Sequence, residues 1–267
     1  MIPVDTALHR VRRDLILSAL LKGAFLFAAV AALTVGPDNT RLVMLLVLIG
    51  AWWMISARSA RGSRMAADSP SLIASGQFEE AERHIEQAMR AFSVFRAVKL
   101  QALHHLALLR HAQRRWQESA ALSRALLAQR LGALQPLSKP AALILADALL
   151  EMNDLRGAYE AILRLYQQRL SLTEVLNLMA IQLDYMARIE AWEPMMEQWM
   201  AKVQLTELMP PQAAARAQAT LAVAALRTGR RDIADWLRAR AELLADPKRL
   251  AAERPMLWEV WARSAEC

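Results

Sequence analysis

One short pattern recurs five times along this chain, and it constrains the fold more than any other feature. Its clearest copy is Gly76-Gln77-Phe78-Glu79-Glu80-Ala81, in which a glycine turn leads to an aromatic plug and then to a small residue. The plug positions are Phe78, Trp116, Leu155, Trp192 and Arg231, at intervals of 38, 39, 37 and 39 residues. The positions three residues later are Ala81, Ser119, Ala158, Met195 and Ala234. This period predicts stacked helical hairpins, since one hairpin cannot bury its apolar face alone.

Composition predicts that the chain is all-α. It has only 8 Gly in 267 residues and is rich in Ala, Leu and Arg, which are good helix formers. An amphipathic run precedes each hinge, as in Leu103, Leu106, Ala107 and Arg110 before Trp116. Prolines fall in the expected loops, at Pro136, Pro140, Pro210-Pro211 and Pro247.

The hinges resemble those of tetratricopeptide repeats, in which a small residue opens the second helix after a Gly-x-aromatic turn. The copy at Gly76 is a close match, and those around Trp116, Leu155, Trp192 and Arg231 are looser. The resemblance covers about residues 70–245, although its period exceeds the family's usual 34 residues. It implies a solenoid of about five hairpins that binds a protein or peptide in a concave groove.

Two apolar runs precede the repeats, at residues 15–35 and 42–57. As helices they would measure about 31 and 24 Å, so they predict two transmembrane helices. The second is short for a full crossing, and either local bilayer thinning or a shallow re-entrant hairpin would accommodate it. The polar turn at residues 36–40 joins them, and Trp52-Trp53 forms an interfacial pair. A secretory signal or a buried hairpin of a soluble protein are further alternatives.

Basic residues flank these runs. Residues 1–64 hold eight Lys/Arg against three Asp, and the rest of the chain holds 25 against 23, so the basic excess belongs to the membrane flanks. The positive-inside rule therefore predicts that both flanks and the repeats face the cytoplasm, and nucleic acid is not the favoured partner. Lys22 lies inside the first run, where it could snorkel toward the basic end. The flank set is Arg10, Arg12, Arg13, Lys22, Arg58, Arg61 and Arg64.

These features predict three regions: a two-helix membrane anchor at 1–64, a tetratricopeptide-like solenoid at 65–252 and a C-terminal capping helix at 253–267. A polar linker around Gly62-Ser63 and Pro70 would separate the anchor from the solenoid. The only cysteine is Cys267, so the fold does not depend on a disulfide.

The resemblance also implies which residues face the groove, because the first helix of each hairpin lines the concave side. The candidate groove residues are Gln101, His104, His105, His111, Asp147, Glu151, Asn177, Asp184, Arg188, Arg216 and Arg227. Histidines early, carboxylates in the middle and arginines late would suit an extended peptide or a partner helix, although a solvated helix face is the simpler alternative. The set lacks the Lys and Asn residues with which the best-known clamps of this family bind a C-terminal carboxylate.

No pattern for catalysis or metal binding accompanies the repeats. Spacings of three or four residues suit metal ligands on one helix, whereas His104 and His111 are seven apart. The chain has no glycine-rich phosphate loop and no Gly-x-Ser-x-Gly or His-Glu-x-x-His sequence. We therefore expect no enzyme, no metal and no cofactor.

The resulting functional prediction is a membrane-anchored scaffold that recruits a partner protein through its groove. The main alternative is a structural subunit or assembly factor of a membrane complex, in which the N-terminal hairpin is the contact element and Lys22 pairs with a carboxylate of another membrane helix. In layout alone, the chain also resembles bacterial membrane tetratricopeptide proteins linked to haem or cytochrome biogenesis.

Overall fold

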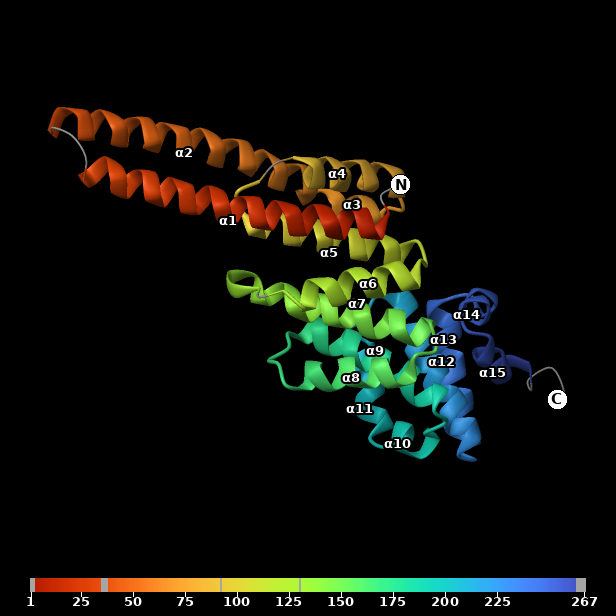
Figure 1. Cartoon of the computed structure of the whole chain (residues 1–267). Helices are drawn as coiled ribbons and strands as arrows, with labels where there is room; N and C mark the ends of the chain where they lie inside the picture. The colour runs from red at the N-terminus through yellow and green to blue at the C-terminus, as the bar shows by residue number, and fades with distance from the viewer. Residues whose placement is uncertain (1–2, 35–37, 92, 130, 263–267) are drawn as a thin grey trace. The chain divides into compact units, whose positions relative to one another are not determined.

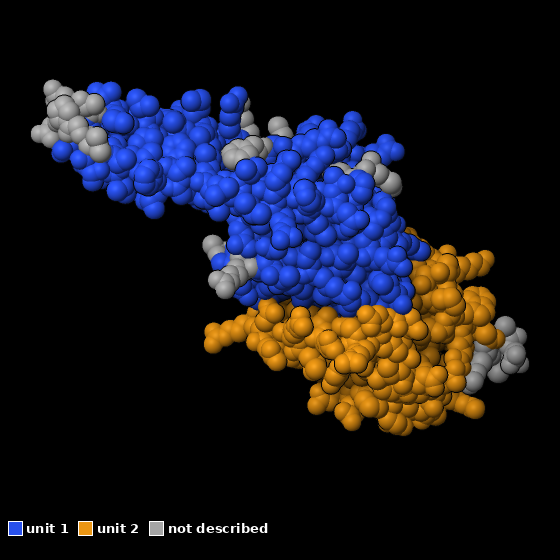
Figure 2. All heavy atoms as spheres, in the orientation of Figure 1, with its two compact units in different colours: residues 1–152 blue, residues 153–267 orange. Residues whose placement is uncertain are grey.

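The computed structural model describes residues 3–34, 38–91, 93–129 and 131–262, without the side chains of residues 38–40, 60–66 and 133. This described part consists of helices and their connections, with no strand, which confirms the all-α prediction. The chain divides into two compact units (Figures 1 and 2), residues 1–152 (unit 1) and residues 153–267 (unit 2).

Unit 1 contains the two apolar helices together with the first helical pairs. Its elements are α1 (Val4–Thr34), α2 (Asp38–Ala67), α3 (Ser69–Ala74), α4 (Phe78–Arg90), α5 (Arg96–Ala112), α6 (Trp116–Leu127), the 3-10 helix η1 (Gly132–Leu137) and α7 (Ser138–Glu151). Each helix from α3 to α6 packs on the next, and α5 also contacts α7. The core holds residues from the start of α1, such as Ala7 and Val11, among side chains of α4 and α5 such as Ile85 and Leu103.

Unit 2 has its own core. Its elements are α8 (Leu155–Tyr166), α9 (Leu172–Arg188), α10 (Trp192–Met196), α11 (Trp199–Thr206), α12 (Pro211–Arg227), α13 (Arg231–Leu244), α14 (Pro247–Glu253), the 3-10 helix η2 (Pro255–Trp258) and α15 (Glu259–Ala262). Helix α12 is central, because it packs on α9, α10, α11, α13 and α15. Leu250, Leu257 and Val260 of the last segment join α9, α12 and α13 in this core.

Each of the five plug residues is the first residue of a helix, so these helices begin three residues before the small residue at which the hinge resemblance places their start. Two positions before each plug the backbone is left-handed, with φ between 50° and 80° at Gly76, Arg114, Asn153, Glu190 and Gly229. At Gly76 the preceding helix closes with two backbone bonds, from Gly76 N–H to Ile73 O and from Gln77 N–H to Leu72 O. The hinges before Trp116, Trp192 and Arg231 have the same pair of bonds. This is a Schellman motif, so these copies share one backbone geometry.

The third residue after each plug is at most 1% exposed, including Met195 in the one copy that lacks a small residue. Its backbone N–H bonds the carbonyl of the residue before the plug in all five copies, for example from Ala81 to Gln77. A small side chain here lets the second helix start close to the first. In the fourth copy Met195 is followed by a break, since α10 ends at Met196 and α11 begins at Trp199.

Three segments differ from the sequence prediction. Helix α1 begins at Val4, eleven residues before the first apolar run. Helix α2 continues to Ala67, so the expected linker at Gly62-Ser63 is wrong; the Arg and Ala residues around that pair favour helix and outweigh one glycine. The final segment forms three short helices, because Pro247 and Pro255 lack a backbone N–H and each stands at a helix start. The prediction of separate anchor, solenoid and cap regions is not tested by this packing.

Candidate functional site

The base of α1 is bonded to unit 1 through a buried ion pair. The Lys99 ammonium on α5 lies 2.7 Å from Asp14 Oδ2 on α1, and it donates to the carbonyls of Met89 and Ala91 at 2.7 Å each. The side chains are 1% and 8% exposed. Removing two charges from water is costly, but three oxygen acceptors satisfy all three donors of the ammonium. Asp14, which the sequence shows only as one charge among the flank residues, is therefore part of the core.

A second contact lies one turn farther along α1. Ser18 Oγ donates to Val94 O at 2.6 Å, and Val94 N–H donates to Ser59 Oγ of α2 at 3.0 Å. All three residues are buried. The α4–α5 loop thus bonds both α1 and α2, through the backbone carbonyl and N–H of Val94. These bonds mark the position along α1 and α2 beyond which the two helices extend from the rest of unit 1.

Beyond that level the hairpin exposes apolar side chains. The most exposed on α1 are Leu20, Leu26 and Phe27, and on α2 Val47, Ile49 and Trp53, each at least 63% exposed. Phe25 and Trp52 form an edge-to-face pair between the helices, with ring centroids 5.3 Å apart. Both helices are long and apolar enough to span a membrane. Figure 1 shows this part of α1 and α2 extending beyond the other helices of unit 1.

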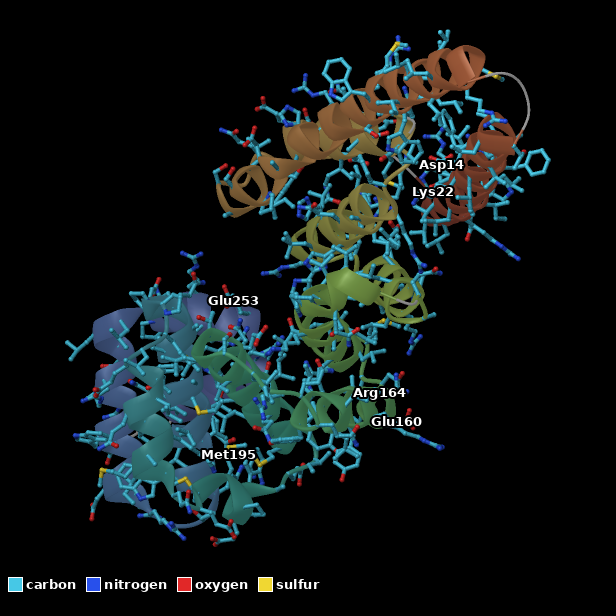
Figure 3. All side chains as sticks on the ribbon, turned by 90° about the vertical axis from the view of Figure 1, so that its left-hand side faces the viewer. Asp14, Lys22, Glu160, Arg164, Met195 and Glu253 are labelled. Atoms are coloured by element: carbon cyan, nitrogen blue, oxygen red, sulfur yellow. The ribbon has the colours of Figure 1, made fainter. Side chains whose placement is uncertain are left out.

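The basic flank residues lie mainly on the solvent side of the hairpin base. Arg12, Arg13 and Arg58 are exposed, and Arg10 is half-buried. Lys22 is exposed one turn beyond Ser18, and Figure 3 labels it with Asp14 on α1. The side chains of Arg61 and Arg64 lie outside the described residues, although their backbone is part of α2.

The candidate groove residues of unit 1 fall into two groups. His111 Nε2 on α5 lies 2.7 Å from Asp147 Oδ2 on α7, and both side chains are about one-fifth exposed. Gln101 and Glu151 are half-buried. His104 and His105 are buried, and burial, reinforced by the neighbouring His105, lowers the pKa of His104 to about 4. The structure thus pairs His111 with Asp147 and places the other two histidines in the interior of unit 1.

In unit 2 the chain's own C-terminal segment bonds two of the candidates. Arg254 Nη2 lies 2.9 Å from Asp184 Oδ2, and Arg227 Nη2 lies 2.9 Å from Glu259 Oε2. Asn177 is exposed, and Arg188 and Arg216 are half-buried. An external ligand would have to displace the residue 254 and 259 side chains to use Asp184 or Arg227.

Arg110, in the amphipathic run before Trp116, is a second buried charge of unit 1, which sequence reasoning did not show. Its side chain is 0% exposed and contacts Glu82 at 2.8 Å, Glu118 at 3.1 Å and Gln113 at 2.7 Å. These partners come from α4, α6 and the end of α5, so the guanidinium joins three helices around the hinge before Trp116. The available signal was that Arg110 lies seven residues after Leu103, on the apolar side of the helix.

Asp147 and Glu151, one turn apart on α7, are the carboxylates among the groove candidates of unit 1, and together with the partly exposed His111 they could offer ligands to an ion. The His111–Asp147 bond gives two of them a partner without an ion. Comparisons of the chain with protein-family models, curated proteins and solved structures find no match. The tetratricopeptide likeness therefore rests on the hinge residues alone, and the expectation of no enzyme, metal or cofactor stays a prediction.

Proposed function

We propose that this protein is a membrane-anchored scaffold, in which α1 and α2 enter the bilayer as a hairpin and a tetratricopeptide-like solenoid holds a partner protein at the cytoplasmic surface. The observation that carries this proposal is the contrast along α1 and α2. Their bases are buried in unit 1 around Asp14 and Ser59, while their outer parts expose apolar side chains with no covering element in the described chain. Arginines on both flanks support the cytoplasmic side.

Extraction of native membranes with alkaline carbonate tests the anchor. We expect the full chain to stay in the membrane pellet, and a Leu26→Glu/Val47→Glu variant to be lost from it, because both side chains are about two-thirds exposed and take no part in the core. Leu243→Glu is the matched control, since Leu243 is 85% exposed in unit 2. Extraction of the unmodified chain, or retention of the double variant, would refute the anchor.

The recruiting surface that we propose is the His111–Asp147 face of unit 1. A partner held there would gain effective concentration at the membrane, so a weak contact would be enough. Crosslinking in native membranes should lose one specific partner in the His111→Gln/Asp147→Asn variant. Glu160→Gln, an exposed carboxylate on α8 (Figure 3), is the control for a change of charge alone. If the set of crosslinked partners is unchanged, the His111–Asp147 face does not bind a partner.

A second candidate function is a subunit of a membrane complex that uses the hairpin as its contact. The observation that favours it is Lys22, which is exposed on the apolar part of α1 and has no acceptor within the described part of the chain. This alternative predicts that Lys22→Leu weakens co-purification with other membrane proteins, whereas recruitment through unit 1 predicts that it does not.

A further inference from the structure

The α4–α5 loop lies at the level where the hairpin changes from polar to apolar. Val94 bonds Ser18 of α1 and Ser59 of α2. On α1 the exposed side chains change from Arg12 and Arg13 to Ile16, Leu17 and Leu20 just before and after Ser18. On α2 they change from Arg58 to Ala57, Met54 and Trp53. Two helices running in opposite directions thus place the boundary at the same loop.

Phe95 is an exposed aromatic residue among the described residues of this loop. The residue is 38% exposed although it follows the fully buried Val94. The turn is ordered by Ser93, whose hydroxyl accepts from Phe95 N–H at 3.1 Å and donates to Phe95 O at 3.2 Å. Aromatic side chains are favoured at the level of lipid headgroups, where an apolar ring meets a polar surrounding.

Lys22 lies one helical turn beyond Ser18, the residue of α1 that bonds this loop. The two residues are four positions apart, so Lys22 is about 6 Å farther along the helix. A lysine stem of about this length can return the ammonium to the level of Val94, which is the level of the headgroup phosphates if the exposed apolar surface is in lipid. Lys22 then needs no carboxylate from another protein.

We infer that Phe95 and Lys22 form a lipid-headgroup contact, in which Phe95 inserts at the bilayer surface and Lys22 binds a phospholipid phosphate. This inference rests on the membrane anchor of the proposed function. It makes unit 1 a body that sits on the bilayer, held there by the loop as well as by the hairpin.

Site-directed spin labelling of the full chain in vesicles of phosphatidylcholine and phosphatidylglycerol tests the inference. Cys267→Ser removes the only cysteine, and single cysteines are then placed at Phe95, Leu26 and Gln117. Gln117 is exposed near the opposite end of α5 from Phe95 and reports water, while Leu26 reports lipid. We expect a ratio of oxygen to nickel-chelate accessibility at position 95 several-fold above that at 117.

The outcomes separate the inference from the proposal beneath it. A lipid signal at 26 with a water signal at 95 overturns the headgroup contact and keeps the anchor. A water signal at 26 overturns both. In the Leu26→Cys background, Lys22→Leu should move the label deeper by up to one helical turn, about 5 Å, and Lys22→Arg should leave its depth unchanged. An unchanged depth in Lys22→Leu overturns the role of Lys22.

Discussion

A terminal segment packs on the core at each end of the described chain and contributes one residue to a buried ion pair. The two ion pairs differ in burial and in the number of acceptors. At the N-terminal end, the Lys99 ammonium of unit 1 is fully enclosed and reaches Asp14 and two carbonyls. At the C-terminal end, Arg254 of unit 2 is 15% exposed and directs its Nε and Nη2 to a single oxygen of Asp184, at 3.3 and 2.9 Å.

This difference shows how strongly each segment depends on its ion pair. The C-terminal segment also buries Leu250 and Leu257 completely, so apolar contacts hold it and Arg254 mainly fixes its register. Of the apolar residues at the start of α1, Ala7 and Val11 are buried, while Val4, Leu8 and Leu15 are only partly buried, so the ion pair and the Val94 bonds carry more of the attachment there. The stronger polar contact thus occurs where a projecting helix must be held.

Breaking the N-terminal pair should have the largest effect. Asp14→Ala leaves the Lys99 ammonium buried without its counter-charge, and we expect a loss of about 3–5 kcal/mol in the free energy of unfolding, measured by chemical denaturation in detergent micelles. The double variant Asp14→Leu/Lys99→Met removes both charges and should be within about 1 kcal/mol of the unmodified chain. A loss below about 1 kcal/mol in Asp14→Ala would mean that water reaches the pair.

Acid should lower the stability of unit 1 more than that of unit 2, because all five histidines lie in unit 1. His104 is neutral in the folded chain, since its pKa is about 4 instead of 6.5, and the unfolded chain therefore binds one more proton between these values. Its contribution to stability is complete above pH 6.5 and falls by about 3 kcal/mol as the pH drops to 4.

The measurement is the difference in pH-dependent stability between the unmodified chain and His104→Gln, which should lack this component. His9→Gln, at an exposed position of α1, is the control. Parallel curves for the unmodified chain and His104→Gln would contradict the prediction.

At the C-terminal end, Arg254→Ala should destabilise by about 2 kcal/mol, less than Asp14→Ala, because it leaves the buried Asp184 unpaired while Leu250 and Leu257 stay in place. Limited proteolysis should then cut residues 246–262 faster than in the unmodified chain. Arg249→Ala is the control, since Arg249 is 67% exposed and should change stability by less than about 0.5 kcal/mol. If Arg254→Ala and Arg249→Ala change stability equally, the pairing of Arg254 with Asp184 does not stabilise the C-terminal segment.

The smallest effects concern the hinges, which both units share. A left-handed backbone costs a residue with a side chain about 1–2 kcal/mol, so Arg114→Gly in unit 1 and Glu190→Gly in unit 2 should each stabilise by about 1 kcal/mol. Gly76→Ala should destabilise by a similar amount, although a Cβ there meets no atom within 4 Å. Thermal unfolding monitored by circular dichroism measures all three variants. If Arg114→Gly or Glu190→Gly is less stable than the unmodified chain, the side chain that was removed stabilises the fold by more than the left-handed backbone costs.

These hinges also show what the sequence could predict. The period of plug residues located five helix starts to within three residues. Four plugs are half-buried and Arg231 is exposed, so burial of a large side chain is not common to all five. The left-handed residue was visible at Gly76 and Gly229, and Asn153 is of a type that tolerates this conformation. Arg114 and Glu190 adopt it although their residue types do not indicate it.

The site was less predictable, because its polar partners are far apart in sequence. Asp14 and Lys99 are 85 positions apart, Asp184 and Arg254 are 70, and no local pattern joins them. The resemblance did select His111 and Asp147, which bond each other, but it also selected His104 and His105, which are buried. Helix α5 is covered on several sides by α1, α4, α6 and α7, and one helical period cannot show that.

The position of Asp14 has a consequence for how the protein is made. A ribosome that adds about 5–20 residues per second releases Asp14 roughly 4–17 s before Lys99. During that interval the apolar hairpin is completed, while the start of the chain still lacks its partner. On the membrane anchor proposed above, insertion of the hairpin precedes closure of unit 1, and the nascent repeats fold onto a helix base that the bilayer already holds. That proposal makes the anchor the template on which unit 1 is built.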